Sequence, residues 1–454
     1  MIDSKKYRDL GTSIKRKENK RDHFILQMMM DKEWFNSINF CHLTQEEIKE
    51  WQFKRIKQIV KHAYNNVPMY HDKYSKVGFH PKDLKNWKDF ENLPILNKEE
   101  IIEAFPDRSI SKKYNFKFTT RSSGSSGKFV TIVVSSEAIY RDTIQGARQF
   151  FFQSGGNYKP DDLALFIYTC PWWVSSINGK YKTLFYPTTT KIEEATNIIK
   201  QIRPKILSLY PTYLLKFYEN SVPLKEYGVD LIIVHSEQTS SKQRLEMSNF
   251  FKIPVLDEFS SEELTRIALE CPNKKYHLEE DACYVEIIDS KTHKNLSPGN
   301  QGMLIGTNLL NEATPIIRYF QGDIACIDMD NSCSCGSNFR TIKSFSGRFM
   351  DSIVSTYGEI IPASCFMDLA YNWYLEMNIP IHGLKYQIIQ QTDGSIDINL
   401  QPKQYQISPI DKIKIKNSLY QLLPKDTTIR VKFVNRFLDT GSKFRPIISF
   451  KEKK

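Results

Sequence analysis

The sequence lacks the features that would place it in a membrane or in a disulfide scaffold. No uninterrupted apolar stretch in its 454 residues approaches the roughly 18 that a membrane-spanning helix needs. The first residues also lack the apolar core of a secretory signal peptide, so we expect the protein in the cytoplasm. Eight irregularly spaced cysteines do not make a disulfide framework in a chain of this size and suggest buried thiols, with a metal cluster as an alternative.

A strong excess of charge of one sign is also missing. The chain has 63 basic and 52 acidic residues, a net charge of +11 that favours anionic partners such as nucleotides, nucleic acid or anionic lipid. Because the basic residues are interspersed with acids, we do not expect nucleic acid. With 41% hydrophobic and 13% aromatic residues, the composition is that of a globular protein with a large core, which excludes disorder or coiled coil as the main state.

Alternating helix and strand patterns predict an α/β protein. A helix is expected from Thr44, where Glu47 completes a capping box. Between residues 192 and 257 helices and strands alternate. A helix is expected at Ile192–Ile202 and another from Pro211, and strands are expected at 205–209, 229–234 and 254–257. Repeated units of this kind indicate a mainly parallel sheet covered by helices.

The pattern changes after about Arg348. Strands are expected at 384–390, 396–400 and 429–434, and helices at 363–374 and 409–423. These elements make a compact α+β unit of normal domain size. We therefore expect a large N-terminal domain over residues 1–348, with its first 25 residues basic and mobile or on the surface, and a small mobile domain over 349–454.

A loop rich in serine and glycine precedes the expected strand 131–134. It has the sequence Ser122-Ser123-Gly124-Ser125-Ser126-Gly127-Lys128, and its backbone and hydroxyl donors could surround the oxygens of a triphosphate. It is not a Walker A loop, because two residues separate its glycines where that motif has four. A flexible hairpin turn explains the same composition.

Together with two upstream segments, this loop resembles the signature of the adenylate-forming superfamily of acyl- and aryl-CoA synthetases and luciferases. The segments are His62–Tyr70 and Leu93–Lys98, and they are most similar to the phenylacetate–CoA ligase branch and its capsule-biosynthesis relatives. The resemblance runs from about residue 50 to the C-terminus. It implies an enzyme that activates a carboxylic acid with ATP and Mg²⁺, releases pyrophosphate, and passes the acyl group from the AMP adduct to coenzyme A.

Two motifs that follow expected strands resemble segments that contact the nucleotide in this superfamily. His235-Ser236-Glu237 matches a turn that lines the adenine pocket at the carboxyl end of a parallel strand. Glu258-Phe259-Ser260-Ser261-Glu262-Glu263 matches Glu-Tyr-Gly-Ser-Thr-Glu, whose last acid binds Mg²⁺ and maps to Glu263. Phe259, Ser260 and Glu262 depart from the pattern. Without the resemblance, the segment is an acidic surface loop.

Two further motifs resemble the ribose-binding and hinge segments. Arg318–Asp323 matches Arg-Tyr-x-Thr-Gly-Asp, whose Asp accepts both ribose hydroxyls and maps to Asp323. Without the resemblance, this block is a turn before a strand at 324–327. Gly347–Asp351 matches Gly-Arg-x-x-Asp, so Arg348 would contact ribose or phosphate and the domain boundary would follow it. Met350 stands where many relatives carry an acid.

A lysine near the C-terminus completes the resemblance. Asp439–Arg445 is similar to the Ser-Gly-Lys-x-x-Arg signature, with the Gly and Ser in inverted order. In the superfamily this lysine bridges the carboxylate and the α-phosphate as negative charge builds. Lys443 is therefore expected to act in catalysis, together with Glu263 and Arg348. On composition alone, Lys443 is a solvated surface residue.

Four residues could close a structural zinc site. Cys271 and His277 lie close together in the sequence, and Cys333 and Cys335 follow after an insert. Three thiolates and one imidazole suit tetrahedral zinc, although the spacing is unusual for a zinc finger. The phenylacetate–CoA ligase branch carries a similar Cys…His…Cys-x-Cys-Gly arrangement.

The sequence leaves the substrates and two rival functions open. Aromatic residues at 168–173 and 210–213 could line a pocket for a small carboxylic acid, or they could be core. The acyl acceptor could be a thiol, usually coenzyme A, or an amine of a sugar or amino acid, and a homodimer is compatible with the resemblance. The rivals are a degenerate relative that binds nucleotide without turnover and a protein that binds nucleic acid or an anionic surface.

Overall fold

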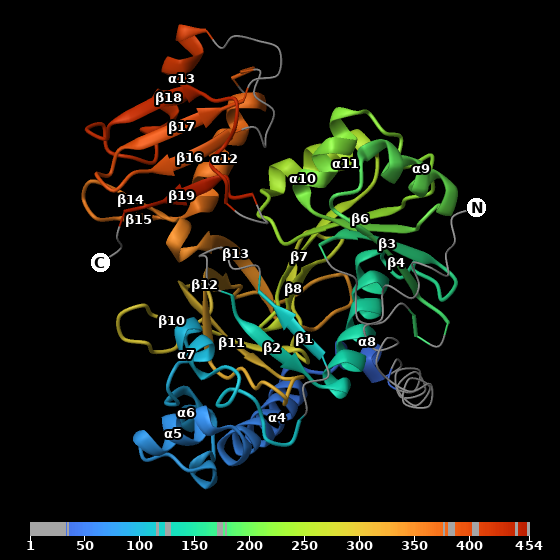
Figure 1. Cartoon of the computed structure of the whole chain (residues 1–454), viewed down its shortest axis with the longest axis vertical. Coiled ribbons are helices and arrows are strands. Elements are labelled where there is room, and N and C mark those ends of the chain that lie inside the picture. Colours follow the sequence, from blue (N-terminus) through green and yellow to red (C-terminus); the bar gives the residue numbers. More distant parts are fainter. Residues whose placement is uncertain are drawn as a thin grey trace.

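The computed structural model describes residues 33, 36–114, 118–122, 129–169, 176–177, 179–375, 377–379, 386–401, 408–440 and 444–451. These residues form two lobes (Figure 1). The large lobe is built on an 11-stranded sheet, and the small lobe on a four-stranded sheet. Among the described residues, no helix combines the length and apolarity that crossing a bilayer requires.

One half of the large sheet is parallel. Its strands run in the order β4, β3, β5, β6 and β7, and every neighbouring pair is parallel. Their bounds are β3 (Leu163–Tyr168), β4 (Lys182–Pro187), β5 (Ile206–Leu209), β6 (Leu231–His235) and β7 (Val255–Ser261). All parallel strands of this half end at the same edge of the sheet, which is where ligands gather in such folds.

Helices cover both faces of the parallel half. One face packs against α9 (Ile192–Ile202), α10 (Pro211–Glu219) and α11 (Ser241–Phe251), and the other packs against α8 (Ser136–Gln153). The predicted ends of α9 and the start of α10 are confirmed: Arg203 takes a left-handed φ of 48° before Pro204, and Pro211 is the first residue of α10.

The other half of the large sheet is antiparallel. Strands β8, β9, β13, β12, β11 and β10 extend it beyond β7. Their bounds are β8 (Thr265–Glu270), β9 (Tyr276–Leu278), β10 (Cys283–Ile288), β11 (Gln301–Asn308), β12 (Tyr319–Ile327) and β13 (Thr341–Arg348). The expectation of a mainly parallel sheet is therefore correct only up to β7, because no helix intervenes between β7 and β13.

N-terminal helices and a hairpin complete the large lobe. The helices are α4 (Gln45–Asn66), α5 (Pro68–Lys76), η1 (Pro81–Asp83), α6 (Trp87–Glu91) and α7 (Lys98–Ala104), and most of them pack on the antiparallel half. The capping box expected at Thr44 is present, with Glu47 bonded to the Thr44 amide. The hairpin pairs β1 (Phe118–Arg121) with β2 (Thr131–Val134).

The small lobe has a core of its own. Its four strands lie in the order β18, β17, β16 and β19, beside the short pair β14–β15 and two helices. Their bounds are η2 (Phe349–Asp351), β14 (Ile353–Val354), β15 (Ile360–Ile361), α12 (Ala363–Leu375), β16 (Tyr386–Gln390), β17 (Ile396–Leu400), α13 (Pro409–Leu419), β18 (Ile429–Phe433) and β19 (Ile447–Ser449). Hydrogen bonds between α11 and α12 join the lobes: Lys242 Nζ on α11 donates to Asn372 Oδ1 at 2.7 Å, and the Tyr371 hydroxyl on α12 donates to Glu246 Oε2 at 2.7 Å.

Candidate active site

Hydrogen bonds between Ser122 and Val130 join the two ends of the serine-glycine loop, which we call its stem. The Ser122 amide donates to the Val130 carbonyl at 3.0 Å, and the Val130 amide donates to Ser122 Oγ at 2.9 Å. The other candidate residues of this loop, Ser123, Gly124, Ser125, Ser126, Gly127 and Lys128, lie outside the described residues. On β1, the Thr120 hydroxyl donates to Glu262 Oε2 at 2.5 Å, so the stem is tied to the segment after β7.

Glu263 is buried, with 6% of its surface exposed. The Tyr319 hydroxyl donates to Glu263 Oε1 at 3.2 Å. Burial raises the pKa of Glu263, and the charges of Lys98 and Arg348 and the bond from Tyr319 oppose that rise. The carboxylate therefore lies among cations in a desolvated position, a setting in which a divalent cation would favour its charged form.

Asp323 and Arg348 are cross-strand partners in the β12–β13 ladder. Gln321 Nε2 donates to Asp323 Oδ2 at 2.7 Å, and Gly322 between them has a φ of 102°, which favours glycine. The alternative interpretation of this block, a turn before a strand that begins at residue 324, is wrong, because β12 already begins at Tyr319. Two residues expected at the ribose are thus adjacent, although 25 positions separate them in the sequence.

Glu258, Phe259 and Ser260 lie along β7 at its carboxyl half. Glu258 pairs in register with His235, and its Oε2 accepts from Gln149 Nε2 at 2.9 Å. Burial would raise the pKa of Glu258, but the charges of Arg266 and His235 outweigh burial and lower it. Phe259 packs against Phe345 with ring centroids 4.4 Å apart, and the register shifts between Phe259 and Ser260.

Ser236 and Glu237 follow β6 at the edge where the parallel strands end. Ser236 has a left-handed φ of 70°, which turns the chain sharply. Glu237 Oε2 accepts from the Thr212 amide at 3.0 Å, in the first turn of α10. Glu237 Oε1 accepts from the Phe444 amide at 3.2 Å, in the small lobe.

Lys443 itself lies outside the described residues, but residues on both sides of it are held by contacts. Arg445 forms an ion pair with Asp351, which is 7% exposed and belongs to the hinge-like motif. Gln387 Nε2 donates to the carbonyls of Leu438 and Arg445 at 3.3 and 3.1 Å. The segment that carries Lys443 is thus anchored to the small lobe.

The contacts described above link five of the motifs into a closed circuit, and the strand that leads into the serine-glycine loop is attached to it. Thr120 on that strand contacts Glu262, Glu263 contacts Tyr319 in the motif Arg318–Asp323, and Asp323 pairs with Arg348 in the motif Gly347–Asp351. The circuit then runs through Asp351–Arg445 and Phe444–Glu237, and returns to β7 through the register pair His235–Glu258. Segments spread over more than 300 residues therefore converge at the seam of the two lobes.

Aromatic rings gather at the carboxyl ends of three parallel strands. Tyr168 is the last residue of β3, Tyr210 lies between β5 and α10, and His235 is the last residue of β6. The centroids of these three rings lie 5.0 to 5.7 Å apart. Tyr213, by contrast, is 2% exposed in the core beneath α10. The residues at 170–173 lie outside the described part of the chain.

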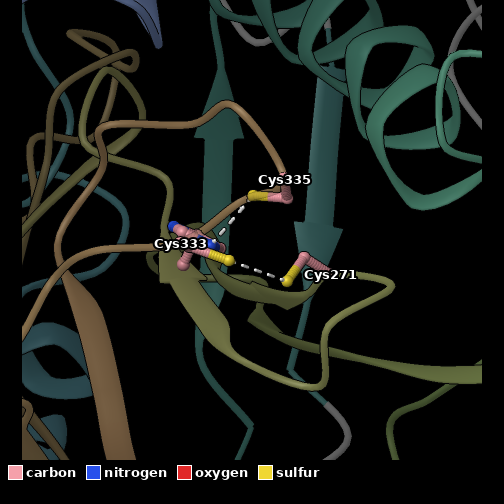
Figure 2. Close-up of side chains that lie close together, drawn as sticks. Cys271, Cys333 and Cys335 are labelled. Carbon is pink, nitrogen blue, oxygen red and sulfur yellow. Dashed lines mark hydrogen bonds between the residues drawn. The ribbon is translucent and has the colours of Figure 1, made fainter.

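The four candidate zinc ligands come together at the end of the β8–β9 hairpin. Figure 2 shows the sulfurs of Cys271, Cys333 and Cys335 turned toward one another, and the four ligand atoms, His277 included, lie within 4.8 Å of one another. The Cys271 and Cys333 sulfurs are 3.7 Å apart, close to the edge of about 3.8 Å that a tetrahedron with Zn–S of about 2.3 Å requires. His277 Nδ1 lies 3.0 Å from the Phe339 carbonyl, which leaves Nε2 facing Cys335 Sγ at 3.3 Å. The donor set and its geometry fit zinc.

The sequence alone did not assign three of these residues. Lys98 and Asp351 stand in segments that the resemblance quotes, but their partners Glu263 and Arg445 are far away in the sequence, so the contacts have no local pattern. The hydrogen bond from the Tyr319 hydroxyl to Glu263 has no local pattern either, because 56 positions separate the two residues. A sequence signal for such pairs would need covariation between distant positions.

Comparisons of the sequence with known proteins support the resemblance. No protein-family model matches the chain. It is 26% identical over 299 residues to the phenylacetate-coenzyme A ligase of Aromatoleum evansii, which covers 62% of this chain and 67% of that one. It is 24% identical over 357 residues to the phenylacetate-coenzyme A ligase of Escherichia coli strain K12, covering 73% and 80%. The similarity that the motifs predicted is confirmed.

Comparisons of the structure with solved structures identify proteins that share this fold. The chain matches a 2-hydroxyisobutyryl-CoA ligase, solved in its post-adenylation state with its acyl-AMP, with a TM-score of 0.74, 17% identity and coverage of 90% and 91%. It matches ATP-bound MatB of Rhodopseudomonas palustris with a TM-score of 0.54, 13% identity and coverage of 73% and 68%. The predicted α/β fold of adenylate-forming enzymes is confirmed. The first ligase in its thioesterification state scores 0.60, so the lobes of this chain are arranged more like the post-adenylation structure.

Proposed function

We propose that this chain, which shares its fold with those ligases, activates a carboxylic acid with ATP. The carboxylate attacks the α-phosphate and displaces pyrophosphate, giving an acyl-adenylate. The thiol of coenzyme A then attacks the acyl carbon, forming a thioester and releasing AMP. The similarity to phenylacetate–CoA ligases supports this reaction class.

The observation that carries the proposal is the closed circuit of contacts among five motifs, to which Thr120 attaches the start of the serine-glycine loop. Three strand ends, a hinge-like segment and a loop of the small lobe are scattered along the sequence, yet they touch one another in pairs. Packing alone gives no reason for these segments to meet at one seam. A single extended ligand such as a nucleotide with its acyl group does.

Each segment takes the role that its chemistry suits. The backbone and hydroxyl donors of Ser122–Lys128 bind the phosphates, and Asp323 with Arg348 binds the ribose. The turn Ser236–Glu237 and the β7 residues 258–260 border the base and the α-phosphate. Lys443 neutralises the charge that builds on the α-phosphate. No protein nucleophile is required, so the catalysis consists of positioning and charge neutralisation.

Glu263 would hold a magnesium ion when the nucleotide is bound. A hard dication prefers carboxylate oxygen, and it would offset the desolvation that raises the pKa of Glu263. When bound, the ion supplies positive charge to the phosphate oxygens. With or without the ion, the Tyr319 hydroxyl orients the Glu263 carboxylate, and the positive charge of Arg348 stabilises its charged form.

The lobes have distinct tasks in this proposal. We place the boundary after Arg348, so that residues 1–348 form the nucleotide-binding domain and 349–454 form the lid that carries Lys443. The cluster Cys271, His277, Cys333 and Cys335 holds a structural zinc, because four protein ligands leave no open position for substrate.

The departures from the family pattern are compatible with activity. Glu262, which replaces a threonine, accepts a bond from Thr120 in the loop stem. Phe259, which replaces a tyrosine, packs on Phe345. Both substitutions therefore have partners within the large lobe, which is compatible with a working enzyme.

The acid is a small carboxylic acid whose side chain lies near the rings of Tyr168 and Tyr210. An amine of a sugar or amino acid is the alternative acceptor to coenzyme A, as in the capsule-type relatives that the motifs resemble. A cytoplasmic location suits both cosubstrates.

The proposal is tested by pyrophosphate exchange into ATP across a panel of aromatic, aliphatic and hydroxy acids. At least one acid should support exchange, and mass spectrometry should then detect its AMP adduct and, with coenzyme A added, its thioester. ATP binding without exchange for any acid would instead establish the degenerate binder. Nucleotide-independent binding to nucleic acid that weakens steeply with salt would establish the other rival.

A further inference from the structure

The carboxylate of Glu237 contacts both lobes at once. Its Oε2 accepts from the Thr212 amide at 3.0 Å, and its Oε1 accepts from the Phe444 amide at 3.2 Å. Thr212 lies in the first turn of α10 in the large lobe, and Phe444 directly follows Lys443 in the small lobe. One side chain therefore joins the end of a helix to the segment that carries the proposed catalytic lysine.

The helix end gives this carboxylate a fixed position. The first amides of a helix have no partner within the helix, and the helix dipole attracts negative charge there. No side chain caps α10 at its N-cap residue Tyr210, which leaves this role to Glu237. Since Oε2 is held by α10, Oε1 presents a defined acceptor to the small lobe.

The other contacts described for the Lys443 segment lie within the small lobe. Arg445 pairs with Asp351, and Gln387 holds the carbonyls of Leu438 and Arg445. These contacts move with the small lobe when it rotates. The bond from Phe444 to Glu237 does not, because it crosses to the large lobe.

We propose that Glu237 is a positioning residue for Lys443, and that its bond to the Phe444 amide holds the lysine segment in place during adenylate formation. This inference rests on the proposed function. A movement of the small lobe between the two half-reactions, as expected for a mobile domain over 349–454, would break this bond, so Glu237 supports the first half-reaction and not the second. Its task is distinct from contact with adenine, which the motif resemblance implies for this turn.

Glu237→Gln is the smallest test of this assignment. The amide keeps the size of the side chain but places an NH2 group where one of the two carboxylate oxygens was, so the amide of Thr212 or that of Phe444 faces a donor and loses its bond. Tyr371→Phe is the matched control, because it removes another interlobe hydrogen bond, to Glu246, far from Lys443 along the chain. Thermal unfolding of both variants verifies that they are folded.

The two half-reactions are then measured separately with the acid that best supports exchange. In Glu237→Gln, kcat for adenylate formation should fall at least tenfold with the KM for ATP within twofold of the wild type. Thioester formation from the synthetic acyl-AMP and coenzyme A should stay within twofold, and Tyr371→Phe should change adenylate formation less than threefold. A raised KM for ATP with unchanged kcat, or an equal loss in both half-reactions, would overturn the inference.

Hydrogen exchange tests the contact without any turnover. In the presence of ATP and Mg²⁺, the peptide that contains Phe444 should exchange faster in Glu237→Gln than in the wild type and Tyr371→Phe. Unchanged exchange would overturn the inference, even if the enzyme proves active. Conversely, the absence of pyrophosphate exchange with every acid in the wild type would refute the proposed function, while the exchange of the Phe444 peptide still decides whether Glu237 holds this segment.

Discussion

Glu263 shows how a single residue can be costly for folding and useful for function. It is 6% exposed, and burial raises its pKa, so its charged form is destabilised in the folded protein. Lys98, Arg348 and the Tyr319 hydroxyl offset only part of that cost. A residue kept in such a position is a candidate for a bound cation, since structural packing would favour an uncharged side chain.

Replacing Glu263 by Gln should therefore separate activity from stability. Pyrophosphate exchange should fall by about 10²-fold or more, because the ligand of the metal loses its charge. Glu99→Gln, at an exposed position of α7, should leave exchange unchanged. Exchange within threefold of the wild type in Glu263→Gln would remove this residue from the metal site.

The stability of the same variant should depend on pH in a defined direction. Because the folded pKa of Glu263 is raised, its contribution to stability is full below the unfolded pKa of about 4.3 and is lost as pH rises through the folded value. Gln does not titrate, so Glu263→Gln should unfold at a higher Tm than the metal-free wild type at pH 7. That advantage should disappear toward pH 4, as measured by calorimetry in the presence of a chelator.

Lys443→Ala tests the role of the lysine near the C-terminus. Removal of the ammonium should reduce adenylate formation by about 10²- to 10³-fold, because the developing charge on the α-phosphate loses its partner. ATP binding, measured by calorimetric titration, should stay within threefold. Lys416→Ala, an exposed lysine of the same lobe on α13, serves as the control. Near-normal exchange in Lys443→Ala would exclude this lysine from the mechanism.

Among the secondary-structure elements, the β8–β9 hairpin connects the proposed zinc site to the nucleotide side of the sheet. Cys271 follows β8 and His277 lies in β9, while Tyr276 of β9 donates to Asp257 of β7 at 2.7 Å. Arg244 of α11 meets Glu270 of β8 at 3.0 Å. A metal that closes the end of the hairpin would therefore stiffen the strand that carries residues 258–261.

Loss of one ligand should release both the metal and this rigidity. The wild type, purified without added zinc, should contain about one zinc per chain, and Cys335→Ser should contain close to none. The variant should also unfold several degrees lower, since metal binding contributes to folding. Cys365→Ser, on α12 of the small lobe, should keep the full zinc content. A wild type with a zinc ratio near zero would refute the metal site.

Elements with strong local signals could be predicted from the sequence. Pro204 and Pro211 mark the end of α9 and the start of α10, and Ile396–Leu400 is a strand in both the prediction and the structure. The antiparallel half of the large sheet could not be predicted. In its order β10, β11, β12, β13, β9 and β8, most neighbours follow one another along the chain, but β13 pairs back with β9, as Thr341 does with His277, and this pairing between distant strands sets the order. Loop closure and burial decide such pairings, and neither has a local pattern.

At the scale of the whole molecule, the candidate site lies at the seam between the two lobes and needs residues from both. The motifs named most of its residues, but their pairing, such as Asp323 beside Arg348 and Glu237 beside Phe444, follows only from the fold. The substrate acid could not be predicted, because aromatic side chains such as Tyr213 serve the core as readily as a pocket. The central claim is that these segments converge on one nucleotide.

A crystal structure of the wild type with ATP and Mg²⁺ tests that claim most directly. We predict the ribose hydroxyls within hydrogen-bond distance, about 2.5–3.0 Å, of the Asp323 carboxylate. The triphosphate should lie against Ser122–Lys128, with the metal ion on Glu263. A nucleotide bound elsewhere, with Asp323 and Glu263 both out of contact with it, would contradict the account.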